Sequence, residues 1–169
     1  LRSETALGAL DAIQPALLAA FARAPEPDKA INRWERLITR LSSAVNLFRL
    51  LEARPALLEV MVRVLSLAPP LADALAMRAD LLDALIDASA FDLPPSVAAL
   101  AADFGEAEAG DDYQRLLDRV RRKVGEKRFA LGVQLIEGAQ DPLDVSARQC
   151  RVAEAAIDVL ARATMADFE

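Results

Sequence analysis

The sequence predicts an all-α fold of about eight or nine helices, in which short helices started by proline precede a long antiparallel helix pair. The 169 residues include 35 alanines and 27 leucines, and only 5% of them are aromatic. Alanine and leucine favour helix, whereas sandwiches and barrels need β-branched and aromatic residues. Prolines divide the first half of the chain, and proline is tolerated in the first turn of a helix but breaks its interior.

The helix boundaries in the first part of the chain follow from proline and capping residues. Helices are predicted over residues 3–13, 15–23, 27–41, 44–54, 55–67, 70–77, 79–86 and 96–104. Ser43 and Ser96 are placed as N-caps, and Gly105 is placed to end the last of these helices. Residues 88–95 are expected to form a loop.

Two of these helices have a predicted inward face. In the helix 15–23, this face consists of Leu17, Leu18 and Phe21. The helix 27–41 has apolar residues three or four positions apart, which are Ile31, Trp34, Leu37, Ile38 and Leu41. Trp34 could anchor a partner, but its place in this stripe favours core packing.

Two long helices, residues 112–139 and 142–169, are predicted to form an antiparallel hairpin. The first has an apolar face and becomes apolar nearly all round from 129 to 136, so its second half must be buried on more than one side. That face consists of Tyr113, Leu116, Leu117, Val120 and Val124. The stripe predicted for the second helix consists of Cys150, Ala153, Ala156, Ile157, Leu160, Thr164 and Phe168. Close helix packing is the favoured explanation of Gly125, Gly132 and Gly138, because no strand precedes them as a phosphate-binding loop would require.

These elements predict a single helical domain over residues 1–169. It consists of a short-helix part (1–104), a mobile linker (105–111) that is acidic and rich in small residues, and the long helix pair (112–169). The chain starts at Leu1 without a signal-peptide pattern. We therefore expect it to be a fragment of a larger polypeptide.

Composition argues against several classes of protein. The chain has no histidine and one cysteine, which excludes Ser-His-Asp and Cys-His catalysis, His-based zinc sites and intrachain disulfides. A net charge of −6 disfavours binding to nucleic acid. The longest charge-free run, Ala12 to Ala22, is shorter than the roughly 20 residues that span a bilayer. A soluble cytoplasmic protein without a membrane segment is expected.

Few residues are candidates for chemistry, and none is predicted to be catalytic, to bind a cofactor or to bind a metal. A basic cluster could bind a nucleotide or an acidic partner, although a solvated face is the commoner meaning of such a run. The cluster consists of Arg121, Arg122, Lys123, Lys127 and Arg128. Asp111 and Asp112 are adjacent and would point apart on a helix, and Asp112 is placed as an N-cap. Cys150 could be a reactive thiol if exposed, but its place on the apolar stripe favours a core residue.

Four blocks rich in leucine and alanine follow one another along the chain. They are SAVNLFRLLEARPALL from Ser43, APPLADAL from Ala68, DLLDALID from Asp80 and KRFALGVQLIEG from Lys127. In this order and spacing, over roughly residues 24–169, they resemble the central helical region of the bifunctional glutamine synthetase adenylyltransferase/deadenylylase family. Ala79 departs from the family pattern, which has proline before the third block.

The resemblance implies a parent enzyme with two nucleotidyltransferase domains that use ATP and magnesium in nitrogen regulation. One domain would transfer AMP from ATP to a tyrosine of glutamine synthetase, and the other would remove it by phosphorolysis, under control of glutamine and the PII signal protein. The Gly-Ser and spaced Asp pair of those domains are missing from this chain, so no catalytic residue is carried over. The implied role is a non-catalytic connecting and regulatory region between the two domains. The alternative is an independent helical module that binds a protein partner.

Overall fold

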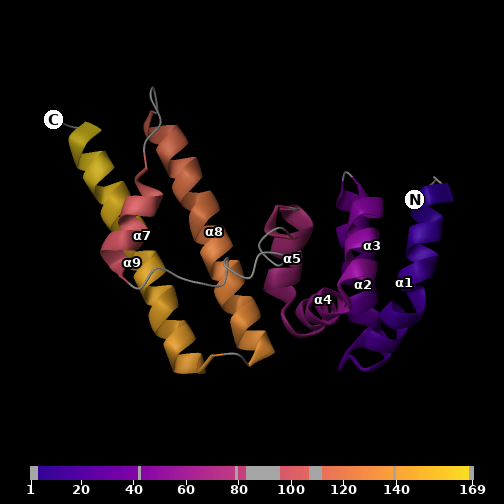
Figure 1. The fold of residues 1–169 in the computed structure, drawn as a ribbon. Helices are drawn as coiled ribbons and strands as arrows, with labels where there is room; N and C mark the ends of the chain where they lie inside the picture. The colour runs from indigo at the N-terminus through magenta and orange to yellow at the C-terminus, as the bar shows by residue number, and fades with distance from the viewer. Residues whose placement is uncertain are drawn as a thin grey trace. The chain divides into compact units, whose positions relative to one another are not determined.

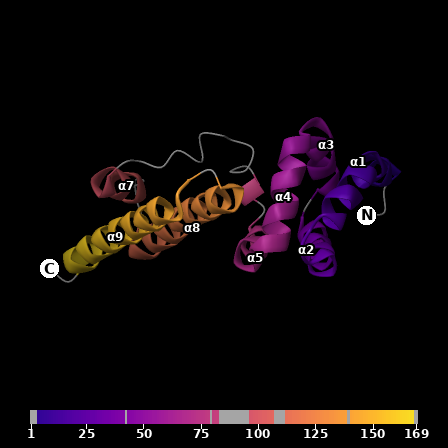
Figure 2. The ribbon, with the colours of Figure 1, turned by 90° about the horizontal axis from the view of Figure 1, so that it is seen from below.

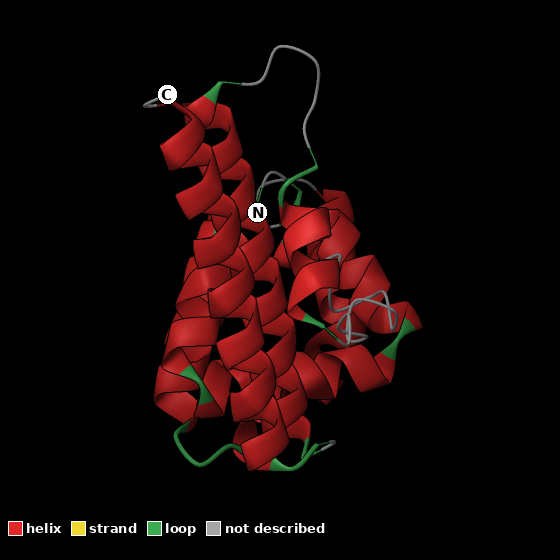
Figure 3. Ribbon diagram, turned by 90° about the vertical axis from the view of Figure 1, so that its left-hand side faces the viewer, coloured by secondary structure: helices red, strands yellow, loops and turns green. Residues whose placement is uncertain are grey.

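The computed structural model describes residues 4–41, 43–78, 80–82, 96–106, 112–138 and 140–167. Within these ranges the chain forms eight helices and no strand (Figure 1 and Figure 3). The helices are α1 (Glu4–Ala22), α2 (Pro27–Arg40), α3 (Ala44–Ala53), α4 (Pro55–Leu67), α5 (Pro69–Met77), α7 (Val97–Phe104), α8 (Tyr113–Glu137) and α9 (Pro142–Asp167). The prediction of an all-α fold with about eight or nine helices is confirmed.

The chain divides into two compact units, residues 1–86 and 87–169. The mobile linker predicted at 105–111 within a single domain lies further along the chain, and most of it lies outside the described residues, as does the loop expected at 88–95. α7, which we grouped with the short helices, packs on α9 in the second unit. Of the helix predicted over 79–86, only residues 80–82 are described.

α1 is one continuous helix with Pro15 inside it, so the prediction of two separate helices, 3–13 and 15–23, is wrong. Proline removes one hydrogen bond from a helix, but Pro15 is exposed, and water can reach the carbonyl that it leaves without a donor. The buried residues of α1 are Ala6, Ile13, Leu17, Ala20 and Phe21. They lie on both sides of Pro15, which keeps the two halves packed as one helix. Leu18 was predicted to face the core, but it is 54% exposed.

The core of the first unit is built around aromatic side chains from three helices. Trp34 of α2 contacts Phe21 of α1 edge-on at 6.4 Å between ring centroids, and it contacts Phe48 of α3 at 6.0 Å. α4 packs against all of α1, α2, α3 and α5, and it is buried on most of its surface. Core packing of Trp34 is therefore confirmed.

The predicted helix caps are mostly confirmed. The backbone N–H of Ala99 donates to Ser96 Oγ at 3.1 Å, and that of Arg115 donates to Asp112 Oδ1 at 2.8 Å. Ser43 lies at the N-cap of α3, but its side chain makes no capping hydrogen bond. α5 starts at Pro69, one residue before the predicted start.

In the second unit, α8 and α9 lie side by side as the predicted hairpin, with α7 against α9 (Figure 1 and Figure 2). Their shared core consists of Leu100, Phe104, Val120, Leu131, Val145, Val152 and Ala155. The second half of α8 is buried on several sides, as predicted, because Phe129, Ala130, Leu131 and Val133 are all buried.

Gly138 ends α8 for a conformational reason, so the explanation by close helix packing is wrong at this position. Its φ is +66°, and no atom lies within 4 Å of the place where a Cβ would be. Its N–H donates back to the carbonyls of Gln134 and Leu135, as in a helix C-cap. Only glycine adopts this left-handed conformation without strain. Close packing at Gly125 and Gly132 stays a prediction.

The stripe predicted for α9 faces the core only in part, because Ala156 and Leu160 pack against it while Cys150, Ala153 and Ile157 are exposed. The fully buried residues of α9 are Val145, Val152 and Ala155, and Ala156, Val159 and Leu160 are partly buried against the same core. Cys150 is exposed and Ile157 is 68% exposed, so the prediction that Cys150 is a core residue is wrong. The error has a physical cause: α9 is apolar on two sides, and its many alanines give no signal for the inward one. Phe168 lies outside the described residues.

Two apolar stretches of the described chain are long enough to cross a membrane by length and composition alone. They are α1, and α4 with α5 taken as one pair bent by 115°. α1 did not stand out as a charge-free run because it contains Glu4 and Asp11. Core helices of globular proteins also meet this criterion, and both α1 and α4 bury apolar residues in the first unit. Length and composition are therefore weak evidence for a membrane segment here.

Candidate interaction site

The described residues contain no group of three or more His, Cys, Asp or Glu side chains placed to hold a metal ion. Asp112, one of the two adjacent aspartates, caps α8 as predicted, and Asp111 lies outside the described part of the chain. The exposed Cys150 is a free thiol.

The basic cluster of α8 does not form a single patch. Each helical residue turns about 100°, so Arg121 and Arg128 fall within about 20° of each other, and Lys123 and Lys127 fall on a different side. Arg122 points between these two sides. Arg121, Arg122 and Arg128 are exposed, while Lys123 and Lys127 are half-buried. A role for the exposed arginines in binding stays a prediction.

Lys123 instead makes hydrogen bonds within the second unit. Its Nζ donates to the backbone carbonyl of Asp103 at 2.5 Å and to the carboxylate Oδ1 of the same residue at 2.7 Å. Glu106 Oε2 lies 3.8 Å away. Asp103 is in the last turn of α7, where backbone carbonyls have no partner within the helix. Lys123 therefore fixes the end of α7 to α8.

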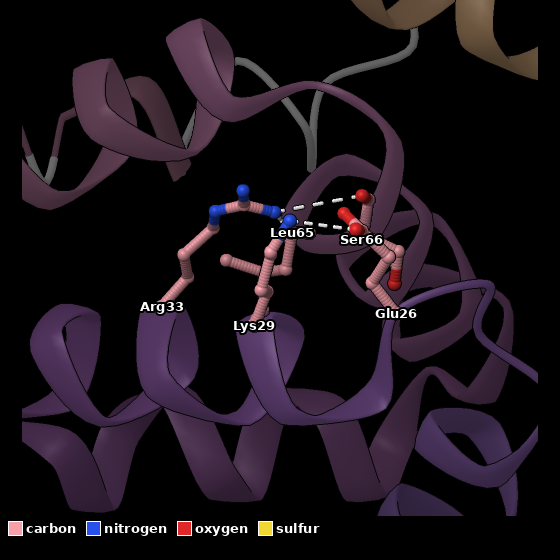
Figure 4. A network of polar contacts seen from close by, with 5 residues as sticks. All are labelled: Glu26, Lys29, Arg33, Leu65 and Ser66. Atoms are coloured by element: carbon pink, nitrogen blue, oxygen red, sulfur yellow. Dashed lines mark hydrogen bonds and ion pairs between the residues drawn. The ribbon is translucent and has the colours of Figure 1, made fainter.

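Arg33 is a structural residue that the sequence analysis missed. Its Nη1 donates to the carbonyl of Leu65 at 2.5 Å and lies 3.5 Å from that of Ser66, at the end of α4 (Figure 4). The chain bends by 115° there, between α4 and α5. The last carbonyls of α4 cannot bond within their helix, and Arg33 supplies the missing donor.

Glu26 and Lys29 lie beside Arg33 (Figure 4). Lys29 Nζ donates to Glu26 Oε1 at 2.6 Å. This hydrogen bond and the positive charge of Lys29, with a smaller contribution from Arg33, lower the pKa of the Glu26 carboxyl below its usual 4.5. The start of α2 therefore carries an ionised acid near its N-terminus, where the helix dipole also favours a negative charge.

An open groove of about 440 Å³ lies in the second unit, between α7, the start of α8 and α9. Its walls are small or apolar residues such as Ala98, Ala101, Leu116 and Val159. Asp158 and Arg162 line one side and form an ion pair at 2.9 Å. The lining of the groove is mostly apolar. No motif in the sequence indicates the groove, because its walls come from three separate helices.

The chain is similar in sequence to several known proteins. No protein-family model matches it. A bifunctional glutamine synthetase adenylyltransferase/adenylyl-removing enzyme of Mesorhizobium japonicum is 32% identical over 160 residues, covering 94% of this chain and 16% of the relative. Enzymes with the same name from Caulobacter vibrioides and Rhodopseudomonas palustris are 34% and 36% identical over 93% and 91% of the chain.

The chain is related in sequence to one segment of these enzymes. The resemblance noted in the sequence is thereby confirmed. The chain spans only about 13 to 16% of the length of the curated adenylyltransferase relatives that it matches. In each of those relatives, the matching segment is therefore accompanied by much more polypeptide. The name of these relatives describes two activities of the whole protein, the transfer and the removal of adenylyl groups.

Proposed function

We propose that this chain is a non-catalytic helical connecting and regulatory region of a glutamine synthetase adenylyltransferase. The observation that carries the proposal is the pattern of the match: up to 95% of this chain aligns, but with a sixth or less of each relative. A segment that small in a bifunctional enzyme leaves room for complete catalytic domains elsewhere in the polypeptide.

The chemistry of the chain supports the non-catalytic part of the proposal. Nucleotidyl transfer needs carboxylates that hold metal ions against the triphosphate. The sequence contains no Gly-Ser dipeptide, and the described residues bring no three acidic, His or Cys side chains together. Arg33 and Lys123, whose side chains donate to backbone carbonyls of other helices, hold helix ends together.

The parent enzyme, in this proposal, transfers AMP from ATP to a tyrosine of glutamine synthetase and removes it by phosphorolysis in nitrogen regulation. ATP and magnesium belong to its two nucleotidyltransferase domains, which adjoin this region in the same polypeptide. Glutamine synthetase and the PII signal protein are partners of the whole enzyme, in the cytoplasm. The helical region would hold the two domains and link their activities.

The reading frame beyond Glu169 tests this proposal against the alternative of an independent interaction module. A strand-forming segment followed by Gly-Ser and a spaced pair of aspartates supports a connecting region. A stop codon directly after the present C-terminus would contradict it and favour the module, for which the groove between α7, α8 and α9 would be the candidate binding surface.

A further inference from the structure

The side of α9 that points away from the core of the second unit is apolar along nearly the whole helix. At about 100° per residue, its residues fall within a sector of about 120°. We call this sector the outer face of α9; its exposed apolar residues are Leu143, Ala147, Cys150, Ala153, Ile157, Ala161 and Met165, and its exposed polar residues are Ser146 and Glu154. Leu143, Ile157 and Met165 are 79%, 68% and 62% exposed. Glu154 is the one charged residue in this sector of the described helix.

A helix at the surface of a protein ordinarily presents charged and polar residues to water. α9 instead keeps most of its charged residues on one flank, such as Asp144, Arg151 and Arg162, between the two apolar sides. One apolar side packs on α7 and α8 through Val145, Val152 and Ala155. A helix that is apolar on two opposite sides is expected to be covered on both.

The size of the outer face indicates what kind of partner covers it. From Leu143 to Met165 it is about 33 Å long at 1.5 Å per residue, and a helix face is about 10 Å wide, which gives about 300 Å². A stable interface between free proteins buries about 800 Å² on each partner. A partner joined by the same chain needs less area, because tethering gives an effective concentration of about millimolar.

In the relatives, the segment that matches this chain is only 13 to 16% of the length, so most of the polypeptide is joined to that segment. This remaining polypeptide is the source of a tethered partner. We propose that the outer face of α9 packs against an apolar helix of an adjoining nucleotidyltransferase domain in the same polypeptide. This inference rests on the proposed function and names the surface through which the connecting region holds its neighbour. The alanines at 147, 153 and 161 let a helix approach closely, because interaxial distance depends on the side chains at the contact.

Cys150 provides a direct probe, since it is the only cysteine of the chain and lies within the outer face. Its labelling by a maleimide is measured in the isolated chain and in the longer parent enzyme, with mass mapping of the peptide that contains it. We expect labelling to be about ten-fold or more slower in the parent, because the thiol is covered there. The matched control is Gln149→Cys in a Cys150→Ala background. Gln149 is also exposed but lies about 100° around the helix, so it should react at similar rates in both proteins.

Ile157→Glu supplies the second variant. It places a charge on the outer face, which should restore fast labelling of Cys150 in the parent while leaving the unfolding midpoint of the isolated chain unchanged. Equal labelling of Cys150 in both proteins would overturn the inference, as would equal slowing of the Gln149→Cys control. Slow labelling already in the isolated chain would assign the face to another part of this chain or to a second copy. The labelling experiment is independent of whether the region is non-catalytic, which the transfer of AMP measures separately. If the chain is not part of a longer polypeptide, the proposed function and this inference both fail.

Discussion

Lys123 of α8 donates hydrogen bonds to both the carboxylate and the backbone carbonyl of Asp103, the residue before the end of α7. One ammonium group thereby serves two purposes: it neutralises an acid, and it completes a helix end. The side chain of Lys123 is only 18% exposed, so water competes weakly for these bonds. The first unit has a parallel arrangement, in which Arg33 completes the end of α4.

Lys123→Met should lower the free energy of unfolding by about 1 to 3 kcal/mol, because it removes charged hydrogen bonds at a partly buried helix end. Urea unfolding followed by circular dichroism measures this. Arg121→Met is the matched control on the same helix. Its ion pair with Asp118 is 3.6 Å long and more than half exposed, so its loss should change the free energy of unfolding by about 0.5 kcal/mol or less. Equal effects of both substitutions would contradict the structural role of Lys123.

Arg33→Met should destabilise the first unit by about 1 to 2 kcal/mol, since it leaves the last carbonyls of α4 without their donor at the bend. Arg36 lies one turn further along α2 and pairs with Asp73 at 3.7 Å, with both side chains 59% exposed. Arg36→Met should therefore cost much less. Thermal melts of the two variants decide the point, and a larger loss for Arg36→Met would be evidence against the interpretation of Arg33.

Two glycines should respond to alanine in opposite directions. Gly8→Ala, within α1 and with open space around it, should stabilise by up to about 1 kcal/mol through helix propensity. Gly138→Ala should destabilise by about 1 to 2 kcal/mol, because its φ of +66° strains any residue with a Cβ. Urea midpoints of both variants check this. Stabilisation by Gly138→Ala would show that the helix end does not depend on the left-handed conformation.

The ion pair of Glu26 with Lys29 predicts a pH dependence of stability. Because the pKa of Glu26 is lowered in the folded chain, its stabilising contribution is present above the usual pKa of 4.5 and is lost as pH falls through the folded value. Wild type should therefore exceed Glu26→Gln in stability at pH 7, and the difference should disappear in more acidic solution. Unfolding curves of both proteins from pH 7 downwards measure it. A difference that persists below the folded pKa would point to a cause other than charge.

Features set by neighbouring residues could be predicted from the sequence. The caps at Ser96 and Asp112 and the start of α4 at Pro55 depend on atoms within a few residues, so local chemistry decides them. The hairpin of α8 and α9 follows from two long helices and a short connection.

Features set by distant contacts could not be predicted in the same way. Pro15 lies inside α1 because residues on both sides of it are buried together in the first unit. Arg33 binds backbone carbonyls more than 30 positions away, which leave no trace in side-chain patterns. Cys150 was misassigned because α9 has two apolar sides, and only the packing of α7 and α8 shows which one is buried.

Transfer of labelled AMP from ATP to purified glutamine synthetase, in the presence of magnesium, tests most directly whether this region is non-catalytic. The isolated chain and the longer parent enzyme that the proposed function implies are assayed side by side. We predict that the longer enzyme labels the synthetase, while the chain alone gives no more label than a blank without protein. Label on the synthetase above that blank, produced by the chain alone, would contradict the proposed function.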